Sequence, residues 1–182
     1  LARSCSVMEN IDDYCRWLRE VVANSEKNPD DADLSYRAID GFEEAMKSRM
    51  LVDVDLDKIT IAAKCRRVGP REIGRELLLA MLDDFPQIES TWRNLSISSL
   101  AHERWLAVSA IQDERISFDL AKELAEKALD DKSSKVRLCA VDRVFVRYIE
   151  SLLPAIKNRE KVEKDRKVLQ YIHWVLNHME QT

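Results

Sequence analysis

Glycine and proline are scarce in this sequence, with three and four residues respectively among 182. Tight turns in β proteins depend on these residues, so the shortage excludes a turn-rich all-β fold. No apolar run approaches the roughly 18 residues that a membrane-spanning helix needs. The first ten residues also lack the apolar core of a secretion signal. We therefore expect a water-soluble helical protein of the cytoplasm, with no membrane contact.

Cysteine and histidine are also few. The four cysteines are Cys5, Cys15, Cys65 and Cys139, and they are widely separated. Disulfide frameworks are typical of small secreted domains, so free thiols in a reducing compartment are the favoured interpretation. Three histidines leave little capacity for acid–base catalysis, and neither they nor the cysteines have the spacing of zinc ligands. We expect no metal, no cofactor and no enzymatic activity.

Two apparent motifs lack the residues that their chemistry requires. His102-Glu103 would open a metalloprotease helix, but position 106, where the second zinc ligand belongs, is Leu106. Gly69 and Gly74 have the spacing of a phosphate-binding loop, but Arg75-Glu76 follows in place of Lys-Ser or Lys-Thr. Neither motif supports a catalytic site.

Charge is distributed unevenly along the chain. Residues 1–60 hold 8 basic and 14 acidic side chains, whereas residues 61–182 hold 21 and 19. The net charge of −4 disfavours a nucleic-acid binder that is basic throughout. The acidic first third instead suits a basic protein partner.

Apolar residues recur at spacings of three and four along almost the whole chain, as is typical of amphipathic helices. Short polar connections, several with Gly or Pro, separate these segments, and short connections favour antiparallel neighbours. We therefore expect an all-α fold of about four helix pairs plus a C-terminal helix. The predicted helices cover residues 10–22, 31–50, 55–67, 70–82, 88–95, 98–111, 118–129, 136–152 and 158–179.

An internal repeat relates three of these helices. Residues 104–111 and 137–144 align without gaps at an offset of 33 residues, sharing an Arg, an Ala and a Val. A further step of 33 residues reaches Arg71, where only the Arg, a small residue and two apolar positions persist. Helix pairs with one apolar face must stack to bury it, so the repeat predicts a solenoid rather than a closed bundle.

The segment DDKSSKVRLCAV, residues 130–141, resembles the HEAT-type repeat. The resemblance covers residues 85–153, and residues 1–60 match only as helical pairs. It implies a right-handed α-solenoid of the HEAT or armadillo kind, here a single domain over residues 1–182. It also implies that an Asp six residues before an Arg ties adjacent repeats together. Asp131 and Arg137 have this spacing. The preceding copy departs from it, because the residue six positions before Arg104 is Ser98. We expect residues 1–7 to be a tag remnant or the edge of a fragment.

Eight residues are candidates for a binding surface. Five basic residues lie close together around a helix junction. They could bind an anion there, because the start of a helix adds affinity for negative charge. Alternatively, Glu72 and Glu76 could offset their charge in a solvated turn. Arg104 and Arg137 would bind either a ligand or, as we favour, the carboxylates and carbonyls of neighbouring repeats. Trp105 belongs either to the core or to the binding face. The candidates are Lys64, Arg66, Arg67, Arg71, Arg75, Arg104, Trp105 and Arg137.

Two functions remain in view. The first is a protein-interaction module, acting as an adaptor, a scaffold or a protein inhibitor. The second is a nucleic-acid-binding protein related to HEAT-like base-excision enzymes, with Arg71, Arg104 and Arg137 as a row of phosphate ligands. Acidic net charge disfavours the second. The sequence does not fix the oligomeric state.

Overall fold

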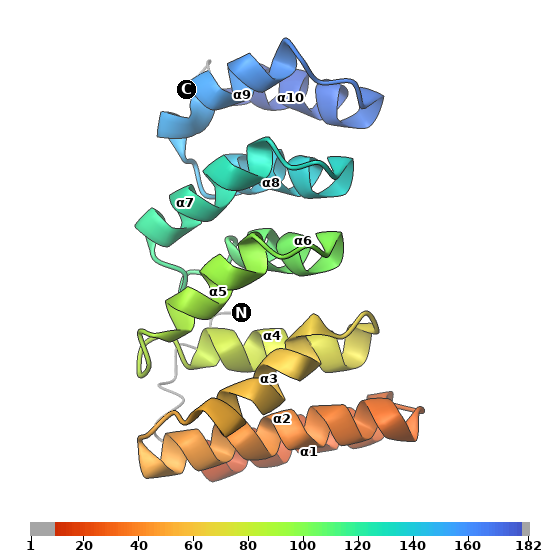
Figure 1. Cartoon of the computed structure of the whole chain (residues 1–182), viewed down its shortest axis with the longest axis vertical. Helices are drawn as coiled ribbons and strands as arrows, with labels where there is room; N and C mark the ends of the chain where they lie inside the picture. Colours follow the sequence, from red (N-terminus) through yellow and green to blue (C-terminus); the bar gives the residue numbers. More distant parts are fainter. Residues whose placement is uncertain (1–9, 180–182) are drawn as a thin grey trace. The chain divides into compact units, whose positions relative to one another are not determined.

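A computed structural model describes residues 10–179, which contain helices and connecting loops but no strand (Figure 1). The all-α expectation is confirmed for this part of the chain. Residues 1–7 and Cys5 lie outside the described residues. The chain divides into two compact units, one ending at Ile88 and the other beginning at Glu89. Within residues 10–179, no helix combines the length and apolarity needed to cross a bilayer.

The described part of the first unit, residues 10–88, contains four α-helices, and α3 packs against both α2 and α4. Their apolar stripes meet in a core that includes the fully buried Phe42, Ile59 and Leu77. Amphipathic helices of this length are stable because each buries one face against the others. The four helices are α1 (Ile11–Ser25), α2 (Pro29–Ser48), α3 (Asp53–Lys64) and α4 (Val68–Ala80).

Helix α2 begins earlier than the sequence predicted. Its cap is Asn28, whose side chain accepts a hydrogen bond from the Asp30 backbone N–H at 2.9 Å. Pro29 follows as the first helical residue, because a proline there needs no N–H and already has a helical φ. Asp31, where the predicted helix began, is instead a buried residue within the first turn of α2.

Two glycines let neighbouring helices of the first unit approach closely. A Cβ on Gly74 of α4 would lie 2.2 Å from the Ala63 backbone N of α3, closer than any real contact. A Cβ on Gly41 of α2 would lie 3.0 Å from the Asp55 carbonyl oxygen, which is tight but nearly tolerable. The small residue in the repeat at position 74 therefore serves close helix packing.

The second unit contains the remaining six helices in two layers. Helix α8 packs against α6 and α10, and α7 packs against α6, α8 and α9, so each helix pair contacts the next one along the chain (Figure 1). Ala107 and Ala140, the repeat-related small residues, are fully buried. The helices are α5 (Ile88–Ser96), α6 (Ala101–Ala110), α7 (Phe118–Leu129), α8 (Ser134–Val146), α9 (Leu153–Glu160) and α10 (Arg166–Met179).

The C-terminal region differs from the prediction of one long terminal helix. Helix α8 ends at Val146, Tyr148 has a positive φ of 51°, and a short 3₁₀ turn precedes α9. Pro154 lies in the first turn of α9, where proline starts a helix rather than ending one. Residues 161–165 then form a loop before α10. The described chain thus ends in a fifth helix pair.

We predict that Gly74→Ala lowers the free energy of unfolding by about 1–3 kcal/mol, because α4 must move away from α3. Urea denaturation followed by circular dichroism measures the change. Gly41→Ala is the matched control, since its Cβ has more room and the better helix propensity of Ala, about 1 kcal/mol, offsets the contact. Equal stability of the two variants would contradict the packing argument.

Candidate functional site

The five-residue basic cluster lies in the first unit, at the junction of α3 and α4. Lys64, Arg66 and Arg67 are exposed, whereas Arg71 and Arg75 are half-buried. Arg67 Nε lies 2.7 Å from Oδ1 of Asp31, a buried residue in the first turn of α2. At least one of the cluster's charges is therefore used within the unit.

Carboxylates also offset Arg71 and Arg75. Glu72 lies 3.3 Å from Arg71 and 4.0 Å from Arg75. Glu26, at the end of α1, lies over the first turn of α4, where a Cβ on Gly69 would lie 1.5 Å from its Oε1. The start of a helix attracts negative charge, and here the chain supplies that charge itself. This arrangement is closer to the solvated, internally offset turn than to an anion site.

Arg104 is buried in the second unit and binds the next helix pair. Its Nε and Nη2 donate to the two carboxylate oxygens of Asp131 at 2.6 and 2.9 Å. Its Nη1 donates to the carbonyl oxygens of Ser98 and Ser99 at 2.8 and 3.0 Å. Only 6% of the Arg104 side chain is exposed, so its hydrogen-bonding groups are directed to the protein itself.

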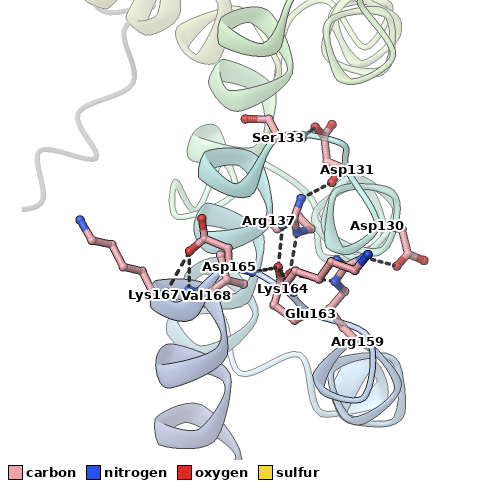
Figure 2. Close-up of polar contacts among 10 residues, drawn as sticks. All are labelled: Asp130, Asp131, Ser133, Arg137, Arg159, Glu163, Lys164, Asp165, Lys167 and Val168. Atoms are coloured by element: carbon pink, nitrogen blue, oxygen red, sulfur yellow. Dashed lines mark hydrogen bonds and ion pairs between the residues drawn. The ribbon is translucent and has the colours of Figure 1, made fainter.

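Arg137 repeats this arrangement one helix pair later (Figure 2). Its Nε and Nη2 donate to Glu163 at 2.7 and 2.6 Å, and its Nη1 donates to the Asp131 carbonyl oxygen at 2.7 Å. Glu163 is fully buried and also accepts from Arg159 Nε at 2.9 Å. Asp131 and Arg137, which the family resemblance paired, meet through the Asp131 carbonyl oxygen, whereas the Asp131 carboxylate binds Arg104 of the preceding helix pair.

These pairs stabilise the charged forms of their carboxylates. The hydrogen bonds from Arg137 lower the pKa of Glu163 to about 2, against the opposing effect of burial. Burial acts against ionisation of Asp131 as well, but the hydrogen bond from Arg104 leaves its pKa below the ordinary value. Arg104 and Arg137 are therefore built into the stack as fixed ion pairs.

Trp105 of α6 is half-buried, and so it belongs neither wholly to the core nor wholly to the surface. A larger aromatic group, which the sequence did not indicate, lies on α8 and α10. The Trp174 ring lies 4.8 Å from the Phe145 ring, 5.4 Å from Tyr171 and 4.2 Å from His178, between centroids. We call these four residues the aromatic patch.

The aromatic patch is held in place by polar contacts. Tyr171 donates to Asp142 Oδ1 at 2.6 Å, and burial together with this bond raises the pKa of Tyr171 to about 12. His178 Nδ1 lies 2.6 Å from the Trp174 carbonyl oxygen. Trp174 nevertheless remains 40% exposed. Positions 171, 174 and 178 share one helical face, but that spacing alone does not mark them as a surface.

Other features of the described residues offer less. Among them, no three His, Cys, Asp or Glu side chains are grouped so that they could hold a metal ion. An open hollow of about 650 Å³ lies between α1 and α2, lined chiefly by charged side chains such as Arg19, Glu20 and Glu43. Arg19 is bonded there to Asp40 and Glu43, at 2.7 and 2.6 Å. On α1, Trp17 is 53% exposed but its ring contacts only that of Tyr14 among the described residues, whereas Trp174 contacts three rings, and we therefore take the aromatic patch as the candidate binding surface.

Comparison with known proteins finds no family model, no curated protein and no solved structure that matches this chain.

We predict that Glu163→Gln lowers the free energy of unfolding by about 3 kcal/mol at pH 7, because Arg137 loses its buried charge partner. Glu163 has a lowered pKa, so the stability it contributes is present above about pH 4.5 and is lost as the pH falls toward 2. The difference between the wild type and the variant should therefore shrink over that range.

Urea denaturation at pH 7, 4 and 3 measures this difference. Glu126→Gln, at an exposed position of α7, is the matched control and should change stability little at any of these pH values. A difference for Glu163→Gln that stays constant from pH 7 to pH 3 would contradict the buried pair.

Proposed function

We propose that this chain is a protein-interaction module of the HEAT type, which binds a partner through the face formed by α8 and α10. The observation that carries the proposal is the aromatic patch. Its central residue, Trp174, is 40% exposed, whereas the next residue of α10, Val175, is fully buried. Large, rigid aromatic side chains are the residues that most often anchor protein interfaces.

Preorganisation of the patch supports this proposal. Tyr171 and His178 pack on Trp174 from the preceding and following turns of α10, and Phe145 contacts it from α8. A binding surface that is already ordered loses less side-chain entropy when a partner binds. The patch therefore needs no rearrangement to receive an apolar side chain.

The stacking of helix pairs in the second unit also supports it. The Arg104–Asp131 and Arg137–Glu163 pairs each join one helix pair to the next. They resemble the inter-repeat ties that the HEAT resemblance implied. A stack held in this way presents one layer of helices as a continuous surface, which is how repeat proteins bind their partners.

The nucleic-acid alternative has less support. Two of the three arginines in the suggested row, Arg104 and Arg137, have 6% and 10% of their side chains exposed. Their guanidinium groups bind carboxylates, so they do not offer charge to phosphates. Phosphate contacts supply most of the affinity for nucleic acid, so the row as suggested would bind weakly.

The acidic helices α1 and α2 remain a second place where a basic partner protein could bind. Many of their carboxylates, however, are paired within the unit. Lys47 lies 2.6 Å from Asp12 and 2.5 Å from Glu43, and Arg37 lies 2.8 Å from Asp33. This internal pairing lowers the charge available to a partner, and we therefore place the binding surface on the second unit.

We predict that the wild-type chain captures a discrete partner protein from native extract and that Trp174→Ser reduces the recovery at least tenfold. Quantitative mass spectrometry of the captured proteins gives the measurement. Phe118→Ser is the matched control, because Phe118 is also an exposed aromatic residue of the second unit but lies on α7, outside the patch. Capture that is equal for all three chains would refute the assigned surface.

A further inference from the structure

Exposed basic side chains gather at the starts of α8 and α10 and in the loops before them. We call this group the basic edge. It comprises Lys132, Lys135, Lys164, Arg166 and Lys167, all of which are exposed. Figure 2 shows the Lys167 side chain directed away from the buried Arg137–Glu163 pair.

Three of the four acids in these loops are used within the protein, whereas the Asp130 side chain is 84% exposed and lies 3.5 Å from Arg159 Nη1. Asp131 binds Arg104, and Glu163 binds Arg137. Asp165 caps α10, since its Oδ1 accepts hydrogen bonds from the backbone N–H groups of Lys167 and Val168 at 3.0 and 3.3 Å (Figure 2). These carboxylates therefore do little to neutralise the lysines outside, and the starts of the two helices add their own positive potential.

Helices α8 and α10 carry little negative charge of their own. Asp142 is the one acidic residue in the two helical segments Ser134–Val146 and Arg166–Met179. Its carboxylate accepts a hydrogen bond from Tyr171 and lies 3.0 Å from Arg143 Nη1. The face is therefore basic at one end and aromatic along the helices.

The basic edge and the aromatic patch share one face of α10. Lys167, Tyr171, Trp174 and His178 follow one another at spacings of four, three and four residues, so they lie along one side of the helix. Eleven residues of helix span about 16 Å. An extended peptide covers that distance with about five residues.

We propose that this face binds a short acidic segment of a partner protein, with its carboxylates on the basic edge and an apolar side chain on the aromatic patch. This inference rests on the proposed function and adds the chemical class of the partner. Opposite charges steer such a segment onto the edge, and the patch then holds it in one register.

The arrangement of the rings favours a peptide over a single-stranded nucleic acid. Bases bind by stacking on an open aromatic face. Tyr171 stacks on Trp174 at an interplanar angle of 13°, and His178 contacts the same ring. The part of the Trp174 ring that remains exposed suits contact with an aliphatic or aromatic side chain.

Fluorescence anisotropy of labelled probes tests the proposal with the full chain. The probe is the peptide Glu-Glu-Asp-Gly-Phe-Leu, compared with Lys-Lys-Arg-Gly-Phe-Leu and with a twelve-residue oligothymidine. We expect the acidic peptide to bind at least tenfold more tightly than the basic one. We also expect its affinity to fall at least threefold when NaCl is raised from 50 to 300 mM, because salt screens exposed charges.

Two variants separate the two ends of the site. Lys135→Glu/Lys167→Glu should weaken the acidic peptide at least tenfold and should keep the fold, because acidic residues are favourable at the starts of helices. Trp174→Ala should weaken it to a similar extent. Lys27→Glu/Arg66→Glu, at two exposed positions in the first unit, is the charge-matched control and should leave binding unchanged.

The outcomes distinguish this inference from the proposed function. Equal binding of the acidic and basic peptides, or tighter binding of the oligothymidine, overturns the acidic-segment proposal. If Trp174-dependent capture from extract persists in that case, the module still binds protein and only the partner class is wrong. If capture is also independent of Trp174, the proposed function fails as well.

Discussion

Arg104 and Arg137 are both buried in the second unit, and each binds a carboxylate that belongs to the next helix pair. Arg104 reaches Asp131 and Arg137 reaches Glu163, each through two hydrogen bonds. Such pairs add little net stability compared with a well-packed apolar core, but removing one partner is costly. Their main effect is therefore to fix the order and register in which helix pairs stack.

The same pairing shapes the surface. Because Asp131 and Glu163 turn inward and Asp165 caps a helix, the exposed Asp130 is the one acidic side chain of these loops left to offset their lysines. Because α8 and α10 pack side by side, their aromatic residues meet in one patch. The partner-binding face that we propose follows from how the stack is held together, and it requires no separate structural element.

Much of the fold could be predicted from periodicity alone. Helices with clear apolar stripes and flanking breaks, such as α7, lie where the sequence placed them. The prediction failed around Pro154, where a proline after a long apolar run looks like a helix end although it lies in the first turn of the next helix. Residues 161–165 look like a charged helix, but Glu163 and Asp165 bind backbone N–H groups and form a loop.

The site was harder to predict, because its residues come together only in the folded chain. The repeat identified Arg104 and Arg137, and carboxylates were favoured over a ligand as their partners. Glu163 could not be named as the partner of Arg137, because it lies 26 residues away and belongs to no sequence motif. The aromatic patch joins Phe145 to Trp174 across two helices, whereas sequence patterns describe one helix at a time. The exposure of Trp174 depends on how α8 packs against α10, and the apolar pattern of one helix does not predict that packing.

The most direct test of the α8–α10 face is to map it by nuclear magnetic resonance. The uniformly ¹⁵N-labelled chain is titrated with the acidic peptide, and shifts of the Trp174 indole N–H and of the backbone amides are followed. The account predicts that the largest shifts fall on Trp174 and on the amides at the starts of α8 and α10. Shifts confined to α1 and α2, or no saturable shift of Trp174, would contradict it.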